Sequence, residues 1–248
     1  NALQGRKLIP TKEIVEKLRM VKDAAELAVI RRAVALADEA MVHLMGVIRV
    51  GMTEREVSWE LESYMRTHGA EAVSFTIIVG SGPNGSMPHA VTTDRRIEPG
   101  ESIVMDLGAK VDGYCSDLTR TFCLGTPQSA EYPKVWEIVL AAQQAARDAI
   151  RAGMPGNEAH AVAQEVIEIA GYGDKFGHGL GHGVGLEIHE KPRASRLSED
   201  VLPAGAVITI EPGIYLPGQF GVRIEDMAVV TETGVEVLTR APKVISVS

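Results

Sequence analysis

The sequence predicts an α+β fold made of two similar halves, each running helix, helix, strands. Ile48–Met52 (Ile-Arg-Val-Gly-Met) recurs as Ile150–Met154 (Ile-Arg-Ala-Gly-Met), an offset of 150 − 48 = 102 residues. Gly100–Gly108 recurs as Gly205–Gly213, an offset of 205 − 100 = 105 residues. Unrelated glycine turns would explain either match alone, but two in the same order at nearly one offset indicate a duplication. Repeats of about 100 residues are too long for a solenoid, so a pseudo-two-fold domain is expected.

Capping signals mark the two helices of the first half. Asp23-x-x-Glu26 is a capping box and predicts a helix through about Ile48, with Gly51 after it. Thr53-x-x-Glu56 predicts a second helix to about His68, ended by Gly69. In the second half, helices are expected over residues 132–151 and 157–170.

Strands follow the helices in each half. Residues 73–79 read as a strand, 81–88 as a loop rich in Gly, Pro and Asn, and 103–109 with 114–124 as a hairpin turning at Asp112-Gly113. Further strands are expected over residues 207–211, 222–230 and 235–238.

Composition sets limits on the protein class. The chain has 248 residues, 45% hydrophobic and 23% charged, enough for one large domain or two small ones. A net charge of −8 argues against a nucleic-acid partner, and no apolar run reaches the roughly 20 residues that span a bilayer. Cys115 and Cys123 lie on one predicted strand, about 26 Å apart at about 3.3 Å per residue, too far for a disulfide. A reduced, cytoplasmic protein is therefore expected.

Five side chains form an oxygen-rich set with a single imidazole: Asp106, Asp117, His182, Glu211 and Glu225. Three of the carboxylates end or follow apolar runs, where a charge is costly unless it is paired or bound to a cation. Such ligands suit manganese, cobalt, iron or zinc rather than a thiolate site. Two such ions would form a hydrolytic centre.

The hairpin brings two of these carboxylates together. With a two-residue turn, Gly108 faces Asp117, and Asp106 shares the face of Gly108 because side chains alternate. The two aspartates then lie about 7–8 Å apart at Cα, close enough to share cations. A bulge would break this parity, and two solvated hairpin aspartates remain the alternative.

His182 lies in a run of alternating glycines, residues 177–185. The run cannot form a stable helix, and it lacks both the G-x-G-x-x-G phosphate-loop spacing and the Glu of H-E-x-x-H. It permits close backbone approach around an imidazole instead. Several histidines at the edges of such loops indicate a site, namely His89, His178, His182 and His189.

The five-residue set resembles that of the metallopeptidase family of methionine aminopeptidase, prolidase and Xaa-Pro aminopeptidase. Four segments look like its proline-peptidase branch: Ser81-Gly-x-Asn84 with Pro88-His89, the stretch 178–190, Glu211–Tyr215 and Val222–Asp226. The resemblance covers residues 11–240 and implies the pita-bread fold, with the metals between its halves.

The resemblance also implies roles for single residues. Asp106 would bind one metal, Asp117 and Glu225 would bridge two, and His182 and Glu211 would complete the other. Glu211 would also shuttle a proton. His89 and His189 would steady the substrate and the tetrahedral intermediate, and His178 would line the substrate pocket. Arg223 would hold a ligand carboxylate. For His178 and Arg223, a purely structural role stays open.

The implied activity is hydrolysis of Xaa-Pro bonds in peptides with proline at the second position, by an aminopeptidase or a dipeptidase. Two divalent ions are expected, manganese or cobalt ahead of zinc or iron. The alternatives are a methionine aminopeptidase, a non-catalytic peptide-binding or chaperone module, and a metal-free creatinase-like hydrolase. All five ligands are present, which disfavours the last two.

The resemblance also suggests how the chain is divided. Residues 22–248 are expected to be the catalytic domain, and residues 1–21 a linker from a missing N-terminal domain, with Asn1-Ala2 a tag remnant. Residues 1–6 do not read as a signal peptide. The full-length protein is expected to be a homodimer without nucleic-acid or membrane partners.

Overall fold

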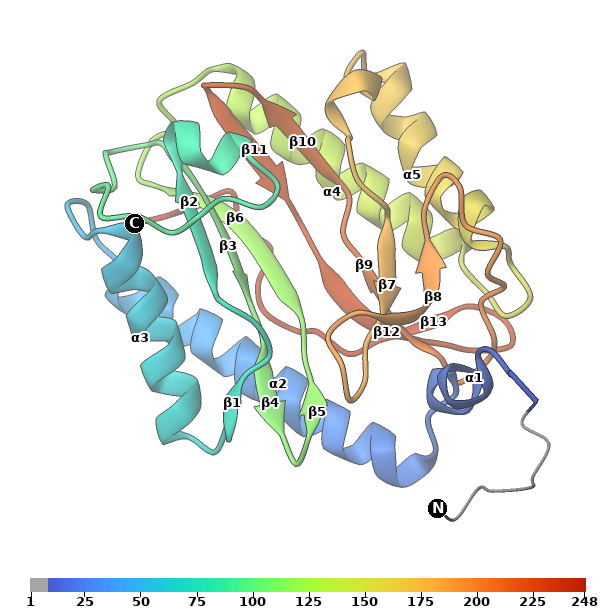
Figure 1. Cartoon of the computed structure of the whole chain (residues 1–248). Coiled ribbons are helices and arrows are strands. Elements are labelled where there is room, and N and C mark those ends of the chain that lie inside the picture. The colour runs from blue at the N-terminus through green and yellow to red at the C-terminus, as the bar shows by residue number, and fades with distance from the viewer. Residues whose placement is uncertain (1–8) are drawn as a thin grey trace.

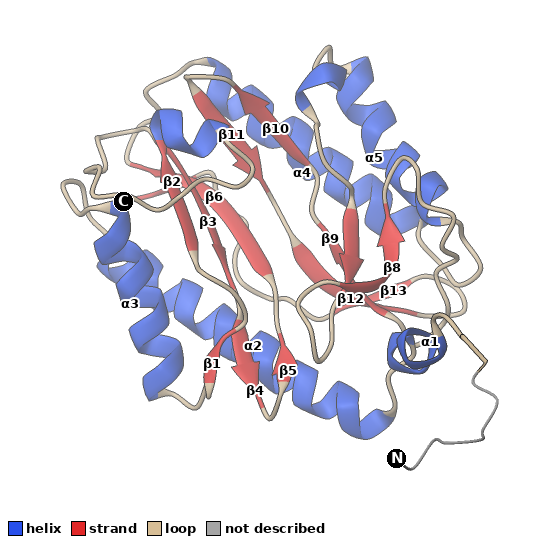
Figure 2. Cartoon of the chain, viewed as in Figure 1, coloured by secondary structure: helices blue, strands red, loops and turns tan. Residues whose placement is uncertain are grey.

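The computed structural model describes residues 9–248. Strands fill the middle of the molecule, with α2 (Ala24–Val47) and α3 (Glu54–Thr67) on one side and α4 (Glu131–Ala149) and α5 (Gly156–Ile169) on the other (Figures 1 and 2). Each helix pair encloses its own buried apolar cluster, and a smaller third cluster joins the halves. The expected architecture of two helix-helix-strand halves is therefore confirmed.

The N-termini of α2 and α3 follow the predicted capping boxes. Asp23 accepts hydrogen bonds from the backbone N–H groups of Ala25 and Glu26, and the Glu26 carboxylate accepts from the Asp23 N–H. Thr53 and Glu56 cap α3 in the same reciprocal way. Each box satisfies N–H groups that the first helical turn leaves free, which explains why these boundaries could be predicted.

The first half carries a four-stranded sheet and a smaller three-stranded one. The larger sheet has the order β14 (Ser246–Val247), β6 (Leu118–Leu124), β3 (Ser102–Leu107), β2 (Ile78–Ser81). The smaller has the order β1 (Ala72–Val73), β4 (Ala109–Val111), β5 (Tyr114–Cys115). The prediction of one strand over residues 73–79 is wrong, because the chain leaves β1 in one sheet and enters β2 in the other. A short 3₁₀ helix, Gly82–Ser86, lies within the predicted loop.

The hairpin turns at Asp112-Gly113, as predicted. Both turn residues have positive φ, 47° and 84°, as a two-residue hairpin turn requires. Val111 pairs with Tyr114 and Asp106 with Thr119, so Gly108 lies opposite Asp117. Each predicted strand is nevertheless interrupted there, because the Ala109 N–H donates to the Ser116 hydroxyl at 2.9 Å and not to the Ser116 carbonyl. The Asp117 N–H points out of the hairpin and donates to Met227 Sδ at 3.0 Å. Cys115 and Cys123 are buried and unpaired, as expected, but lie on separate strands.

A five-stranded sheet forms the second half, in the order β13 (Val235–Val237), β12 (Asp226–Val230), β9 (Val207–Ile210), β7 (Gly181–Gly183), β8 (Glu190–Ala194). A separate hairpin joins β10 (Gly213–Leu216) to β11 (Phe220–Arg223). The predicted single strand over residues 222–230 is wrong. It breaks between β11 and β12 opposite Pro212, which has no N–H to donate to the ladder. The Glu225 N–H, on the other edge of this strand, donates to the Thr119 carbonyl of the first half at 3.1 Å.

Matching hydrogen bonds confirm the internal repeat. The Gly51 N–H donates to the Ile97 carbonyl at 2.9 Å, and the N–H of its counterpart Gly153 donates to the Leu202 carbonyl at 2.9 Å. The repeated glycines Gly100 and Gly205 likewise donate to residues 124 and 230, which end β6 and β12. Conserved bonding at both copies places Asp106 and Glu211 at equivalent points of the two halves.

The N-terminal region is not wholly irregular. Within the predicted linker, Ile14–Met20 forms helix α1, which contacts β8. Among the described residues, no helix is long and apolar enough to cross a membrane.

Candidate metal centre and active site

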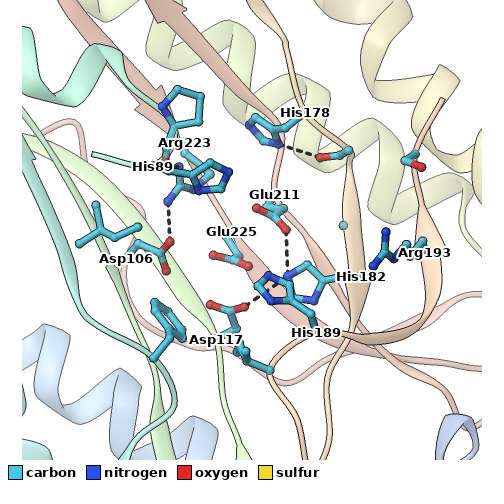
Figure 3. A pocket seen from close by; sticks show the side chains of 17 residues that line it. His89, Asp106, Asp117, His178, His182, His189, Arg193, Glu211, Arg223 and Glu225 are labelled. Atoms are coloured by element: carbon cyan, nitrogen blue, oxygen red, sulfur yellow. Dashed lines mark hydrogen bonds and ion pairs between the residues drawn. The ribbon is translucent and has the colours of Figure 1, made fainter. Parts of the chain in front are cut away.

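A cavity of about 580 Å³ opens between the two halves. Its wall includes all nine residues singled out from the sequence: His89, Asp106, Asp117, His178, His182, His189, Glu211, Arg223 and Glu225 (Figure 3). Residues more than 100 positions apart in the chain therefore converge on one space.

The strand interruptions place the acidic side chains. Asp106 lies in β3 and Asp117 immediately before β6, both in the first half. Glu211 follows β9 and Glu225 precedes β12, in the second half. His182 is the central residue of β7, where Gly181 and Gly183 flank it. A Cβ on either glycine would lie 2.0–2.1 Å from a backbone carbonyl oxygen, so only glycine lets the imidazole strand pack this closely.

Two buried carboxylate oxygens face the cavity without a partner among the described residues. Asp106 Oδ2 accepts from Arg223 Nη2 at 2.6 Å, and Glu225 Oε2 accepts from the Thr119 hydroxyl at 2.6 Å. The second oxygen of each group, Asp106 Oδ1 and Glu225 Oε1, has none. Buried acceptors are nearly always satisfied, so these two oxygens fit a ligand that bears positive charge.

The tightest cluster of ligand atoms comes from Asp117, His182 and Glu225, which lie within 4.8 Å of one another. His182 Nε2 is also 3.3 Å from Glu211 Oε1 and 3.5 Å from Asp117 Oδ2. One imidazole and several carboxylates at this spacing match the donors that divalent first-row metals take.

The pKa shifts of the acidic side chains also indicate a site for cations. Burial, reinforced by neighbouring carboxylates, raises the pKa of Asp117 and of Glu225 well above the usual range. Burial also raises the pKa of Asp106, although the Arg223 charge opposes it. For Glu211, burial is outweighed by the hydrogen bond and charge of His182, which lower its pKa to about 2. The four acidic groups thus outnumber the two cations, Arg223 and His182, and divalent cations would stabilise the ionised carboxylates.

Arg223 is 3% exposed and ties the site to its surroundings. Besides Asp106, its guanidinium donates to the Thr119 hydroxyl, the Pro88 carbonyl and the Tyr215 hydroxyl at 2.9–3.0 Å. Of these partners, Asp106 and Pro88 line the cavity, so Arg223 holds one carboxylate and the segment before His89 at once.

The three other histidines differ in their surroundings. His178 is bonded through Nε2 to the Tyr215 hydroxyl at 3.0 Å and through Nδ1 to the Gly179 carbonyl at 2.8 Å. His89 and His189 are largely exposed at the cavity wall, and His189 packs its ring 4.3 Å from that of His182. Burial and the nearby His182 lower the pKa of His189. An exposed, neutral imidazole is free to bond a bound molecule.

Sequence reasoning missed three residues of the site. The Thr119 hydroxyl donates to Glu225, and the Tyr215 hydroxyl accepts from Arg223. The available signal was spacing, because Thr119 lies two residues after Asp117 and Tyr215 four residues after Glu211, so each could share a strand face with a predicted ligand. Arg193 lines the cavity beside His189, and its guanidinium has no hydrogen bond or ion pair within residues 9–248 (Figure 3). Nothing in its local sequence distinguishes it from a surface arginine.

Comparison with known proteins agrees with this geometry. The model of metallopeptidase family M24 matches residues 28–232. An Xaa-Pro dipeptidase of Pyrococcus furiosus is 45% identical over 231 residues, which are 93% of this chain and 66% of that protein.

Solved structures of two further proteins resemble this chain over nearly its whole length. An Xaa-Pro dipeptidase from Bacillus anthracis superposes with a TM-score of 0.94 at 47% identity, covering 96% of this chain and 67% of that one. An X-Pro aminopeptidase from Thermotoga maritima superposes with a TM-score of 0.94 at 44% identity, covering 98% and 69%. The chain thus spans about two thirds of the length of these relatives. This chain belongs to metallopeptidase family M24 and has its pita-bread fold.

Proposed function

We propose that the chain is the catalytic domain of an exopeptidase that hydrolyses Xaa-Pro bonds with two divalent metal ions. The observation that carries the proposal is the convergence of five metal-type ligands on one cavity, where two buried carboxylate oxygens have no partner among residues 9–248. Relatives named as Xaa-Pro peptidases support the choice of substrate.

Asp106, Asp117, His182, Glu211 and Glu225 would hold the ions, with manganese or cobalt proposed ahead of zinc or iron. When bound, such ions polarise a carbonyl and lower the pKa of water. Arg223 orients Asp106 through its 2.6 Å ion pair.

The chain's own groups would move the proton. The Glu211 carboxylate lies at the cavity wall, where it can accept a proton from the attacking water. The same carboxyl group can then deliver that proton to the proline nitrogen as the peptide bond breaks. His89 and His189 would donate hydrogen bonds to the substrate carbonyl, where negative charge develops. Phe75, Ile78 and Ile188 offer an apolar wall for the pyrrolidine ring.

Arg193 favours a dipeptidase over an aminopeptidase. Its guanidinium lies at the cavity wall without a partner in the described residues, beside His189. The C-terminal carboxylate of a bound dipeptide would be a matching bidentate ligand. A longer peptide would carry an uncharged amide at that point.

Hydrolysis of Gly-Pro, Gly-Pro-NH₂ and Gly-Pro-Pro with added manganese or cobalt tests the proposal. Gly-Pro should be the best substrate, and Arg193→Ala should raise its KM by roughly 10-fold or more, the loss of a charged hydrogen-bonded pair. Gly-Pro-NH₂ should not respond to the change. Arg196→Ala, another exposed arginine on the same segment, is the matched control. No hydrolysis of any of the three would support a non-catalytic module instead.

Metal analysis after loading tests the number of ions. Wild-type protein should hold about two ions per chain, and Asp117→Asn should hold fewer. A strict single ion in wild-type protein, unchanged in Asp117→Asn, would contradict the dinuclear centre.

The remaining assignments are part of the same proposal. Residues 22–248 would be the catalytic domain, and residues 1–21 would lead into it from a further domain. The longer relatives support this division. A homodimer of the full-length protein and a cytoplasmic location are proposed, the latter supported by two free buried cysteines.

A further inference from the structure

His189 has no hydrogen bond of its own within the described part of the chain. The residue is exposed, and its ring packs against that of His182 at 4.3 Å between ring centroids. An imidazole without such a bond is oriented by the backbone that carries it. The placement of His189 therefore depends on what holds the loop 186–190.

The next residue, Glu190, is the anchor of that loop. Its side chain is only 7% exposed. Glu190 Oε1 accepts from Arg19 Nε at 3.1 Å, from Arg19 Nη2, and from the Glu187 N–H at 3.0 Å. Glu190 Oε2 lies 3.4 Å from Lys22 Nζ, an ammonium whose side chain is 1% exposed. One carboxylate thus closes the loop on itself and ties it to two cations.

Both cations belong to the N-terminal segment, residues 13–22. That segment is fixed to the second half, because the Lys22 N–H donates to the Gly205 carbonyl at 3.0 Å and Val21 forms a bridge with Ala206. On the other side of Glu190, Lys191 Nζ pairs with Glu13 at 2.8 Å. The N-terminal segment therefore forms ion pairs with both residues that follow His189, Glu190 and Lys191.

We propose that Arg19, acting through Glu190, is a positioning residue for His189, so that the N-terminal segment helps to set catalytic turnover. This rests on the proposed role of His189. Without Arg19, Glu190 keeps the Glu187 N–H within the loop but only the longer, 3.4 Å contact to Lys22 outside it, so the loop can shift relative to the N-terminal segment. Misplacement of a reacting group by about 1 Å can cost about 10²-fold in rate. Arg19→Ala should therefore lower kcat by roughly 10-fold or more, with KM and metal content nearly unchanged.

The test is a double-mutant cycle between Arg19→Ala and His189→Ala, measured as kcat and KM on Gly-Pro with the metal-loaded protein. If Arg19 acts through His189, its loss has no further effect once His189 is alanine. Arg19→Lys, which keeps the charge, should restore part of kcat. Arg31→Ala is the matched control, because Arg31 makes a paired contact with Glu236 at 2.7 and 2.8 Å far from the loop and on an exposed face.

A second measurement does not depend on turnover. The histidine ring signals in NMR spectra identify His189 by their loss in His189→Ala. That signal should shift or broaden in Arg19→Ala and in Glu190→Gln, and stay in place in Arg31→Ala.

Each outcome of these two experiments either supports or overturns the proposed role of Arg19. Equal loss of kcat in both backgrounds, unchanged kcat in Arg19→Ala, or an unmoved His189 signal would overturn the proposal. Normal turnover in His189→Ala would instead refute the role of His189 in the proposed function. If residual activity in His189→Ala is too low for the cycle, the NMR signal decides alone.

Discussion

Replacing Asp117 by asparagine should stabilise the metal-free protein, although it should damage the metal centre. Asp117 is buried beside Glu225, Asp106 and Glu211, and these carboxylates raise its pKa well above the usual range. The asparagine has nearly the same shape but no charge. Its amide can also donate to Glu225 Oε1, which has no partner among the described residues.

The size of the effect follows from the geometry. Ligand oxygens of Asp117 and Glu225 lie within 4.8 Å, so two ionised groups would repel by roughly 3.5 kcal/mol at an effective dielectric constant of about 20. Proton uptake relieves part of this repulsion. We therefore expect a gain of about 1–3 kcal/mol in the free energy of unfolding at pH 8. Since 1 kcal/mol corresponds to about 2–4 °C in a chain of this size, Tm should rise by about 2–12 °C.

The gain in unfolding free energy from Asp117→Asn should increase as pH rises. A carboxyl whose pKa is raised by folding binds its proton more tightly in the native state, so the wild-type protein loses stability as pH rises from about 4 towards the raised pKa. Asparagine does not titrate. The advantage of Asp117→Asn should therefore be small near pH 4 and grow with pH.

Calorimetry on chelator-treated protein at several pH values measures this, with a second series in manganese. Saturating a site at about 100 times its Kd adds about 2.7 kcal/mol, so metal should stabilise wild-type protein more than the variant and reverse their order. A variant less stable than wild type without metal, or one that gains equally from metal, would refute the reasoning.

Three further outcomes are expected. Glu211→Gln should largely abolish hydrolysis while circular dichroism stays native; near wild-type turnover would remove its assigned role. His189→Ala should lower kcat by about 10²–10³ with metal content intact, and metal loss would make it a ligand instead. Arg120→Met should cost about 3–5 kcal/mol in chemical denaturation, since the buried Arg120 pairs with Asp226 at 2.9 Å and donates to the Ala241 carbonyl. A loss below about 1 kcal/mol would show that other partners of Asp226 compensate.

Local signals in the sequence were enough for helices α2 to α5 and for the hairpin turn, but not for α1, which lies in the predicted linker. The two capping boxes place α2 and α3, because their hydrogen bonds join residues only three positions apart. The Asp112-Gly113 turn sets a register in which Gly108 lies opposite Asp117. That local geometry is why both first-half aspartates could be assigned to one face.

Contacts between the halves occur where the longer predicted strands break. The Glu225 N–H bonds to Thr119, and the Asp117 N–H bonds to Met227, each more than 100 residues away in the chain. Strand periodicity did not reveal these contacts, because each partner lies in the other half.

Tertiary contacts also decided the residues around the site. Arg193 becomes a cavity cation without a partner in residues 9–248, and Arg19 reaches Glu190, because β8 lies at the cavity edge against α1.

The sequence by itself determined the two-half α+β plan, the boundaries of helices α2 to α5 to within about two residues, nine of the residues that line the cavity, and the family. Only the tertiary structure decided where strands end, which carboxylate oxygens stay free and which cations hold the loops. Helix caps and turns are satisfied within a few residues, whereas a buried charge is satisfied by whichever group folding brings to it.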